Sequence, residues 1–171
     1  MPRSMQQRTL QRALRAGAEQ AVLFDVNNII FDPRTLLKCM FGCQDFGFKH
    51  TCPSNPKRLR PPDYEPLLKT YQWGVIIATL ANTECQRIAL DLEYWALRNG
   101  YHFAFSLSDC TLCDICAGFS SAPCRHPQRA RPPLHSVGID VFKTIERLGL
   151  PHQSMPFEDQ TPIWYGAVFV E

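Results

Sequence analysis

The sequence predicts an α/β fold, with a small sheet of about three to five strands, flanking helices, and cysteine loops at strand ends. Short apolar runs rich in β-branched residues alternate with segments of helical periodicity, a pattern typical of helices packed on a sheet. With 45% hydrophobic residues, the 171-residue chain can bury one core. We therefore expect a single domain over 1–171, with cysteine-containing loops at 39–62 and 109–133.

The N-terminal half contains two predicted helices and one or two predicted strands. Residues 5–16 are basic and lack Pro and Gly, which favours a short helix. Apolar residues at 21–24 and 28–31 predict two short strands or one bent strand. A proline-rich, irregular stretch over 54–62 then leads into a predicted helix over 63–71.

The C-terminal half begins with a nearly continuous apolar run. Residues 73–80 predict a central strand that is buried on both faces. Thr83 and Gln86 have the spacing of a capping box, which predicts a helix over 84–98 that stops at Gly100. The remaining predicted elements are a strand over 101–107, a helix over 136–148 and a strand over 163–170.

Charge and composition exclude several classes of function. Eighteen basic against sixteen acidic side chains give a net charge of +2, which is too small for a strong electrostatic grip on nucleic acid. No apolar run approaches the roughly 20 residues of a membrane helix. Residues 1–17 contain four arginines but no apolar core before a cleavage site, so we expect no secretory signal and a cytoplasmic, reducing location.

The second cysteine loop carries the strongest chemical motif. Cys110, Cys113 and Cys116 form two successive C-x2-C steps. Cys124 follows, within a Cys-Arg-His-Pro sequence. Bacterial ferredoxins hold three irons of a [4Fe-4S] cluster with this spacing, whereas zinc more often takes ligands from two separated C-x2-C knuckles. We interpret the loop as a ferredoxin-like metal site.

The first cysteine loop has a looser spacing. Cys39 and Cys43 are four residues apart, and Cys52 follows with a proline directly after it. The last cysteine of the ferredoxin run is also followed by proline, and its thiolate serves the other cluster. This loop is therefore predicted to contribute ligands as well.

Two ligand arrangements remain open. In the cross-paired arrangement, Cys52 completes the C-x2-C-x2-C set and Cys124 joins Cys39 and Cys43. In the sequential arrangement, Cys124 completes that set and the first loop forms a second site. Seven cysteines are one short of the eight ligands that two clusters need, so either one iron takes another ligand or there is a single cluster. We expect one or two [4Fe-4S] clusters, with zinc as the alternative cofactor.

Cys85 stands apart from both loops. It shares an apolar helical face with Ile88, so we expect it to be a small buried hydrophobic side chain. Glu84, Asp91 and Glu93 fall on the polar side of the same predicted helix, where they need no special role.

The cysteine motifs together resemble a microbial family described only as predicted metal-binding proteins. The similarity runs from about Asp25 to the C-terminus, and it includes Ala130-Arg131-Pro132 and the segment 138–142. The resemblance implies iron–sulfur binding through the seven cysteines, but it supplies no reaction. This chain departs from the family where Glu usually follows the Arg-Pro pair, because His135 stands there.

Other residues near the loops have both a functional and an ordinary interpretation. His50 and His126 are candidates for an eighth ligand, or loop histidines packed beside a cluster. Asp109 and Asp114 either lower the cluster potential or are simply exposed. Six cations flank the loops, and they either offset an anionic cluster and dock an acidic partner or are only solvated. These cations are Lys57, Arg58, Arg60, Arg125, Arg129 and Arg131.

Three functions follow as hypotheses. The first is an iron–sulfur protein that transfers electrons or serves as a redox accessory to a partner protein. The second is an enzyme in which one iron without a cysteine ligand binds a small-molecule substrate. The third is an interaction module that zinc stabilises. The sequence leaves open whether the protein is an enzyme.

Overall fold

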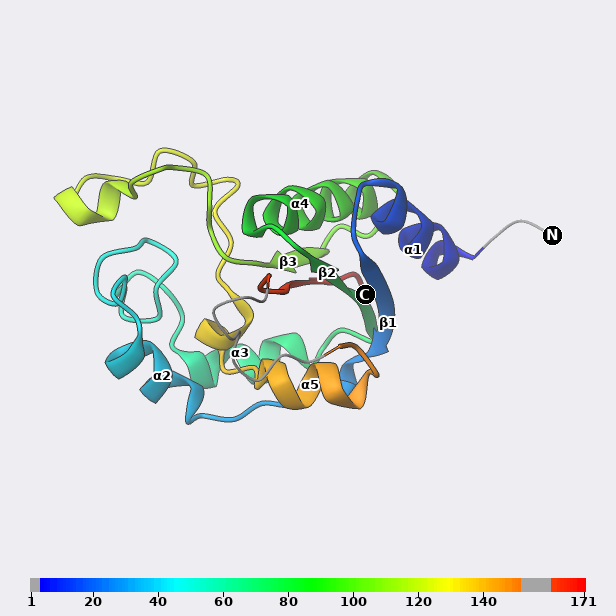
Figure 1. Cartoon of the computed structure of the whole chain (residues 1–171), viewed down its shortest axis with the longest axis horizontal. Helices are drawn as coiled ribbons and strands as arrows, with labels where there is room; N and C mark the ends of the chain where they lie inside the picture. Colours follow the sequence, from blue (N-terminus) through cyan, green and yellow to red (C-terminus); the bar gives the residue numbers. More distant parts are fainter. Residues whose placement is uncertain (1–3, 152–160) are drawn as a thin grey trace.

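A four-stranded antiparallel sheet forms the centre of the computed structural model, which describes residues 4–151 and 161–171 (Figure 1). The strands are β1 (Gln20–Asp25), β2 (Trp73–Thr79), β3 (Phe105–Leu107) and β4 (Trp164–Phe169). Their spatial order is β1-β2-β4-β3, and every pairing is antiparallel. Together with the helices around it, this sheet confirms the predicted α/β fold.

The central strand β2 has the double-sided burial that its composition predicts. Val75 and Ile77 pack on one side of the sheet, and Ile76 packs on the other, because successive side chains of a strand alternate between its faces. All three are fully buried. The sheet therefore carries a separate hydrophobic core on each face.

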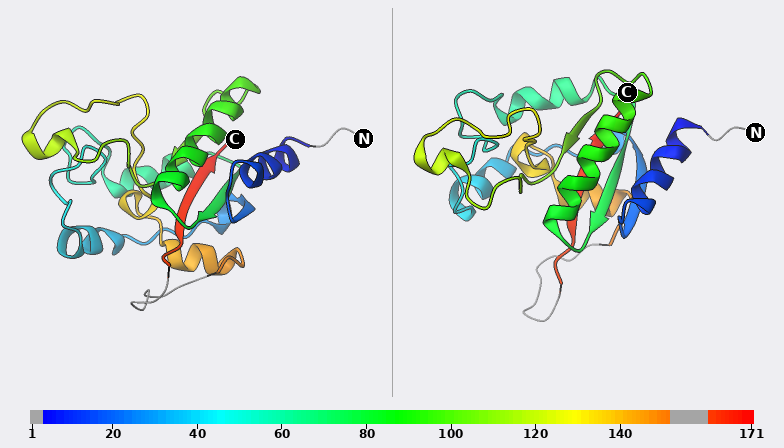
Figure 2. Two further views of the ribbon diagram at one scale, coloured as in Figure 1. Left: turned by 45° about the horizontal axis from the view of Figure 1, so that its top comes forward. Right: turned by 90° about the horizontal axis from the view of Figure 1, so that it is seen from above.

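Helices cover both faces of the sheet (Figures 1 and 2). One face carries α1 (Met5–Arg15) and α4 (Asn82–Arg98). The opposite face carries α3 (Pro61–Leu68), the short 3-10 helix η3 (Leu134–Val137) and α5 (Val141–Arg147).

The two cysteine loops project from one end of this sandwich (Figures 1 and 2). The second loop leaves directly from β3 and contains the short helix η2 (Ala117–Ser120). The first loop follows η1 (Val26–Asn28) and α2 (Thr35–Gly42), so it is reached through a helix rather than from a strand. Cys39 lies in α2 itself.

Three predicted elements are shorter than expected or absent. Residues 28–31 form no strand, because the Asp25 side chain accepts from the Asn27 amide and starts η1, and Phe31 makes only an isolated bridge to Ile139. The helix predicted over 136–148 begins only at 141, after Gly138 adopts a φ of +93° that ends η3. The strand predicted over 101–107 starts at 105, because residues 101–104 form a turn.

The helix predicted over 63–71 is shifted toward the N-terminus. It begins at Pro61, because proline fits the first turn of a helix, where its missing N–H is not needed. It ends at Leu68. Within the described residues, no helix is both long and apolar enough to cross a membrane.

Candidate metal centre

The four cysteines of the second loop share one pocket. The walls of this pocket also include the apolar residues Leu112, Ala117 and Ala130. The cysteines that line it are Cys110, Cys113, Cys116 and Cys124. We call this the four-cysteine pocket. All four are free thiols, and none forms a disulfide with another cysteine of the described residues.

The three cysteines of the first loop interact electrostatically with one another. Cys39 and Cys52 are buried, whereas Cys43 is exposed. Burial raises the pKa of the Cys39 thiol to about 11, and the charges of Cys52, Cys43 and Asp109 raise it further. These groups are therefore close enough to interact electrostatically. We call Cys39, Cys43 and Cys52 the three-cysteine set.

The two loops pack against each other although they are far apart in sequence. The rings of Phe48 and Phe119 stack with their centroids 4.9 Å apart and an interplanar angle of 12°. His50 Nε2 lies 2.8 Å from the carbonyl oxygen of Ala122. Gly118 permits this approach, because a Cβ there would lie 1.9 Å from the carbonyl oxygen of Phe48. One loop thus supports the other.

Gln86 fixes the start of the second loop. Its Oε1 accepts hydrogen bonds from the backbone amide of Thr111 at 2.7 Å and from the Thr111 hydroxyl at 2.8 Å. Gln86 is only 1% exposed. The predicted capping box is therefore wrong: α4 begins at Asn82, its N-cap is Ala81 without a side-chain hydrogen bond, and Gln86 holds the residue after Cys110.

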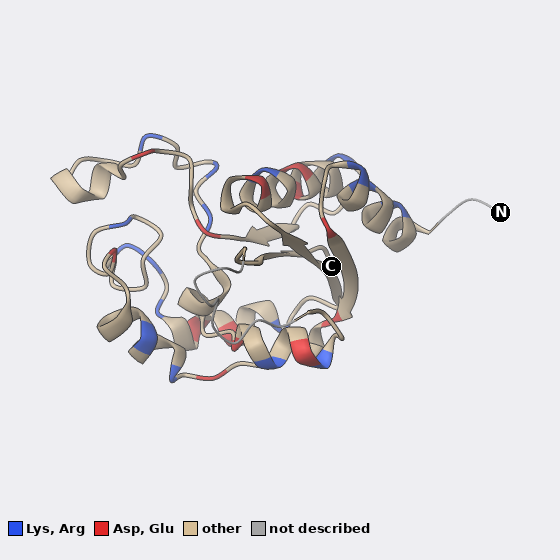
Figure 3. Ribbon diagram, viewed as in Figure 1, with Lys and Arg blue, Asp and Glu red and all other residues tan. Residues whose placement is uncertain are grey.

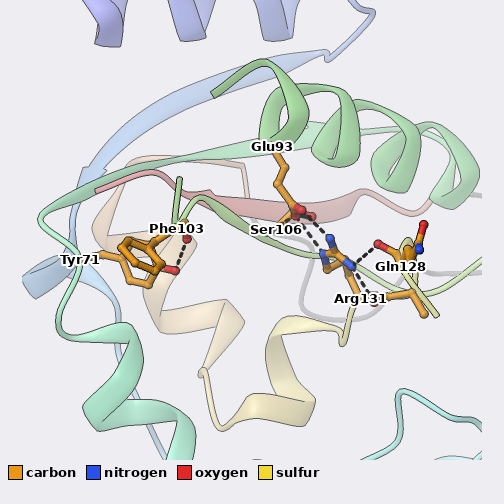
Figure 4. A network of polar contacts seen from close by, with 7 residues as sticks. Tyr71, Glu93, Phe103, Ser106, Gln128 and Arg131 are labelled. Carbon is orange, nitrogen blue, oxygen red and sulfur yellow. Dashed lines mark hydrogen bonds and ion pairs between the residues drawn. The ribbon is translucent and has the colours of Figure 1, made fainter. Parts of the chain in front are cut away.

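Glu93 fixes the end of the same loop (Figure 4). Its Oε2 accepts from Arg131 Nε at 2.9 Å, and a second contact joins its Oε1 to Arg131 Nη2. The same carboxylate accepts from the amide and hydroxyl of Ser106 in β3, at 2.7 and 2.6 Å. The expectation that Glu93 needs no special role is wrong, because it is 2% exposed and ties the loop to the helix and the sheet.

Gln86 and Glu93 were missed because their face of α4 looks ordinary in the sequence. They are seven residues apart, and Leu90 lies between them on the same helical face. Leu90 is buried, so a polar residue on each side of it is the signal that could have shown that both face inward.

Lysines and arginines lie along both cysteine loops, interspersed with a few acidic residues (Figure 3). Lys49 and Arg125 both line the four-cysteine pocket, and Lys49 was not among the predicted residues. Burial alone would lower the pKa of Lys49, but the hydrogen bond to Asp45 and the charges of Asp45, Asp109 and Cys110 raise it. Lys49 therefore keeps its positive charge beside these thiols.

Several of the predicted loop cations have partners within the protein. Arg58 Nε donates to the carbonyl of His50 at 2.9 Å, and Arg125 Nη1 donates to that of Ile115 at 3.2 Å. Arg60 pairs with Asp63, and Arg131 pairs with Glu93. Lys57 and Arg129 are exposed.

The histidines and acidic residues near the loops do not all line the same pocket. His126 and His50 line the four-cysteine pocket, whereas His135 lines a different cleft, which Asp109 also lines. Asp114 is exposed. Cys85 is 1% exposed, as predicted, and burial raises the pKa of its thiol to about 12.

The residues of the four-cysteine pocket fit a bound metal centre by their chemistry. Four unpaired thiols and two cations line it, and no carboxylate does so within the described part of the chain. Across residues 4–151 and 161–171, no three His, Cys, Asp or Glu side chains stand close enough to hold a single ion. Zinc needs its sulfurs about 2.3 Å from one metal, whereas a cluster distributes its ligands over several irons.

The fold and the cysteine loops together define a small α/β protein with a thiol-rich centre at one end of its sheet. The comparisons agree with this class. The model of the family described as "Predicted metal-binding protein (DUF2284)" matches residues 22–170, and the chain belongs to that family. The match confirms the family that the cysteine motifs resemble. Neither the curated proteins nor the solved structures contain a match.

Proposed function

We propose that this protein binds a [4Fe-4S] cluster in the four-cysteine pocket and transfers electrons or serves as a redox accessory. One observation carries the proposal. The C-x2-C-x2-C run and Cys124 line the same pocket as free thiols, on a loop that α4 anchors near both ends. Four thiolates are the ligand set of such a cluster, which supplies one-electron chemistry when bound.

The pocket favours the sequential arrangement of ligands over the cross-paired one. Cys124 lines it together with the run, whereas Cys52 does not belong to its lining among the described residues. Cys52 instead lies near Cys39, whose pKa its charge raises. The three-cysteine set then stands as a separate site with three thiols.

The surroundings of the pocket suit an electron carrier. A cluster held by four thiolates is anionic, and Lys49 and Arg125 would offset that charge and raise its reduction potential. The loop also carries Ile115, which is 71% exposed, and Phe119, which is 45% exposed. Arg129 on the same loop is also exposed, and exposed apolar and cationic side chains are features that a partly acidic redox partner would cover.

Anaerobic purification followed by analysis of iron, acid-labile sulfide and zinc tests the proposal. We expect a brown protein with about four irons and four sulfides per chain for one cluster. Cys113→Ser should lose most of this iron. The matched control Cys85→Ser should retain it, because Cys85 lies in the core. A colourless preparation with stoichiometric zinc would eliminate the proposal.

The three-cysteine set supports a second candidate function, an enzyme with an open iron. Cys39, Cys43 and Cys52 offer one thiolate fewer than a cluster needs, so one iron would bind a substrate atom as a Lewis acid. We expect about eight irons per chain, and a Mössbauer spectrum in which one iron responds to added carboxylate. Four irons that Cys39→Ser leaves unchanged would contradict this function.

Metal removal separates both iron–sulfur functions from a zinc-stabilised module. The two cores on the sheet faces are built from aliphatic and aromatic side chains of the sandwich, not from the loop cysteines of the pocket. We therefore expect chelation to bleach the protein while its far-ultraviolet circular dichroism keeps its shape. Cooperative unfolding on chelation would instead indicate a structural metal.

A further inference from the structure

Gln86 of α4 has a side-chain donor for which the described part of the chain provides no acceptor. Its Oε1 accepts from the Thr111 amide at 2.7 Å and from the Thr111 hydroxyl at 2.8 Å, whereas its Nε2 has no hydrogen-bond partner among the described residues. Gln86 is only 1% exposed, so bulk water does not reach this group. A buried donor without a partner is costly, and where a native protein keeps one, a bound group or a redox role is a common reason.

The partners of Gln86 fix the orientation of its amide group. A backbone N–H can only donate, so the atom that faces the Thr111 amide has to be the side-chain oxygen. Exchanging the oxygen and the nitrogen would place two donors against each other. The free end of the amide group is therefore its NH2, which has hydrogens to donate.

This NH2 group lies beside the first cysteine of the C-x2-C-x2-C run. Thr111 directly follows Cys110, so the Gln86 oxygen is bound to the nitrogen of the peptide bond that joins these two residues. Because Oε1 and Nε2 are attached to the same carbon, the NH2 group also lies close to this peptide bond. Cys110 is a free thiol in the lining of the four-cysteine pocket.

A second buried polar atom on the same segment also has no partner. Ser108 is fully buried, and its Oγ has no hydrogen-bond partner among the described residues. Its backbone is held in place, because the Ser108 amide donates to the Pro132 carbonyl at 3.1 Å. Two of the three such side-chain atoms in the described part of the chain thus lie on either side of Cys110. Their concentration there points to an acceptor in the metal centre.

Sulfur is the acceptor that the four-cysteine pocket offers. No carboxylate lines this pocket within the described residues, and four thiols do. Cluster sulfurs accept hydrogen bonds from N–H groups, and these bonds are among the factors that set the reduction potential. Reduction adds negative charge to the cluster, so a donor stabilises the reduced state more than the oxidised state.

We propose that Gln86 Nε2 donates a hydrogen bond to the sulfur atoms of the cluster on its Cys110 side and thereby raises the reduction potential. This inference rests on the proposed cluster in the four-cysteine pocket and adds a residue that tunes it. The Gln86 amide remains neutral and keeps its protons in both oxidation states, so only the strength of the hydrogen bond changes.

Redox titration of the loaded protein at several pH values tests the role of the donor. Gln86→Glu keeps an oxygen for Thr111 but loses the NH2 group. At alkaline pH, where the new carboxylate only accepts, we expect a reduction equilibrium constant roughly tenfold below that of the unmodified protein, which is about 59 mV for a one-electron couple. At acidic pH the protonated carboxyl donates instead, so the difference should shrink.

Thr111→Val is the matched control for this titration. It removes the hydroxyl bond to Gln86 Oε1 and leaves both the amide bond and the NH2 group, so the potential should stay close to that of the unmodified protein. Equal shifts in Gln86→Glu and Thr111→Val would overturn the proposal, because the anchoring of the loop would then set the potential. An unchanged potential in Gln86→Glu at every pH would overturn it as well.

Pulsed electron paramagnetic resonance of the reduced cluster gives a direct readout. With ¹⁵N in the side-chain amides of glutamine, a hydrogen bond from Gln86 produces a weak ¹⁵N coupling to the electron spin. Gln86→Glu should remove this coupling, whereas Gln44→Glu and Gln128→Glu, at exposed positions on the two loops, should retain it. If Gln86→Glu assembles no cluster, the unmodified protein decides, because the absence of coupling there overturns the proposal.

Iron and sulfide analysis of the same samples separates this inference from the proposed function. A brown protein with a full cluster but no ¹⁵N coupling would end the inference about Gln86 and leave cluster binding intact. A colourless protein with stoichiometric zinc would end both, because no cluster is then present to accept the hydrogen bond.

Discussion

Glu93 holds the end of the second cysteine loop. It is a buried carboxylate with four hydrogen-bond contacts, to Ser106 and Arg131. A buried charge is stable only while it is paired, so the loss of either partner leaves the other charge in a poorly solvated place. The loop end at Arg131 is therefore coupled to the core.

We predict that Glu93→Gln lowers the free energy of unfolding of the metal-free protein by about 3 kcal/mol, because Arg131 then lacks its counter-charge. Urea denaturation measures the change. Glu84→Gln is the control on the same helix, and it should show no measurable change, since its ion pair with Arg87 is exposed. Equal effects of the two substitutions would show that the Glu93 pair does not stabilise the fold.

Cys85 gives the protein a defined response to alkaline pH. Burial raises the pKa of this thiol from an ordinary value of 9.0, which it keeps in the unfolded chain, to about 12 in the folded protein. The folded protein therefore keeps this proton at a pH where the unfolded chain has lost it. Stability contributed by the protonated thiol is complete below pH 9 and declines as the pH rises towards 12.

We predict that Cys85→Ala flattens this decline. The free energy of unfolding, measured in urea at several pH values, should fall less steeply above pH 9 in the variant than in the unmodified protein. At neutral pH the two proteins should show parallel pH dependence. Identical slopes above pH 9 would mean that Cys85 ionises equally readily in both states.

At the scale of elements, α4 does more than cover the sheet. It contributes Ile88 and Leu92 to one core and also holds the second loop through Gln86 and Glu93. Because both anchors belong to one rigid helix, the two ends of the loop keep a fixed separation. A loop prepared in this way loses less conformational entropy when its thiols bind a metal centre.

We predict that Gln86→Met increases the hydrogen-exchange rate of the Thr111 amide by roughly tenfold, because this amide then has no buried acceptor. Mass spectrometry of peptides over 109–116 measures the rate. Thr111→Val keeps the amide bond to Gln86 and loses only the hydroxyl bond, so it should cause a smaller increase. Unchanged exchange in Gln86→Met would indicate that Gln86 does not hold the loop.

At the scale of the whole molecule, the two cysteine loops form one structure through contacts that are remote in sequence. The ring stack of Phe48 and Phe119 and the contact of His50 with Ala122 connect them. The four-cysteine pocket is completed by Lys49, His50 and Thr51 of the first loop. The four-cysteine pocket is therefore built from both halves of the chain.

We predict that Gly118→Ala separates the loops, because the new Cβ would lie 1.9 Å from the Phe48 carbonyl oxygen. We expect a loss of about 1–3 kcal/mol in the free energy of unfolding, and faster release of iron to a chelator from the proposed cluster. Gly42→Ala is the matched control, since its Cβ meets nothing within 4 Å in α2. If both variants retain iron equally, contact between the loops does not protect the centre.

The sequence alone was enough to predict the elements that depend on a local pattern of apolar residues. The apolar run of β2 and the periodicity of α4 were correctly predicted, because both depend on local patterns of burial. The cysteine spacing likewise predicted a metal-binding protein, and the family match agrees with it. The ligand roles of the seven cysteines remain predictions.

Tertiary structure alone decided which partners meet. Gln86 has the local features of a capping residue, yet a hydrogen bond to Thr111, 25 residues away, determines its role. The local sequence predicts that Glu93 is a solvated acid. In the structure, Arg131, which is 38 residues away in sequence, donates a hydrogen bond to its carboxylate. Packing also decides that the described lining of the four-cysteine pocket includes Thr51 but not Cys52. Local sequence cannot specify such pairs, because long-range contacts depend on how the sheet brings distant segments together.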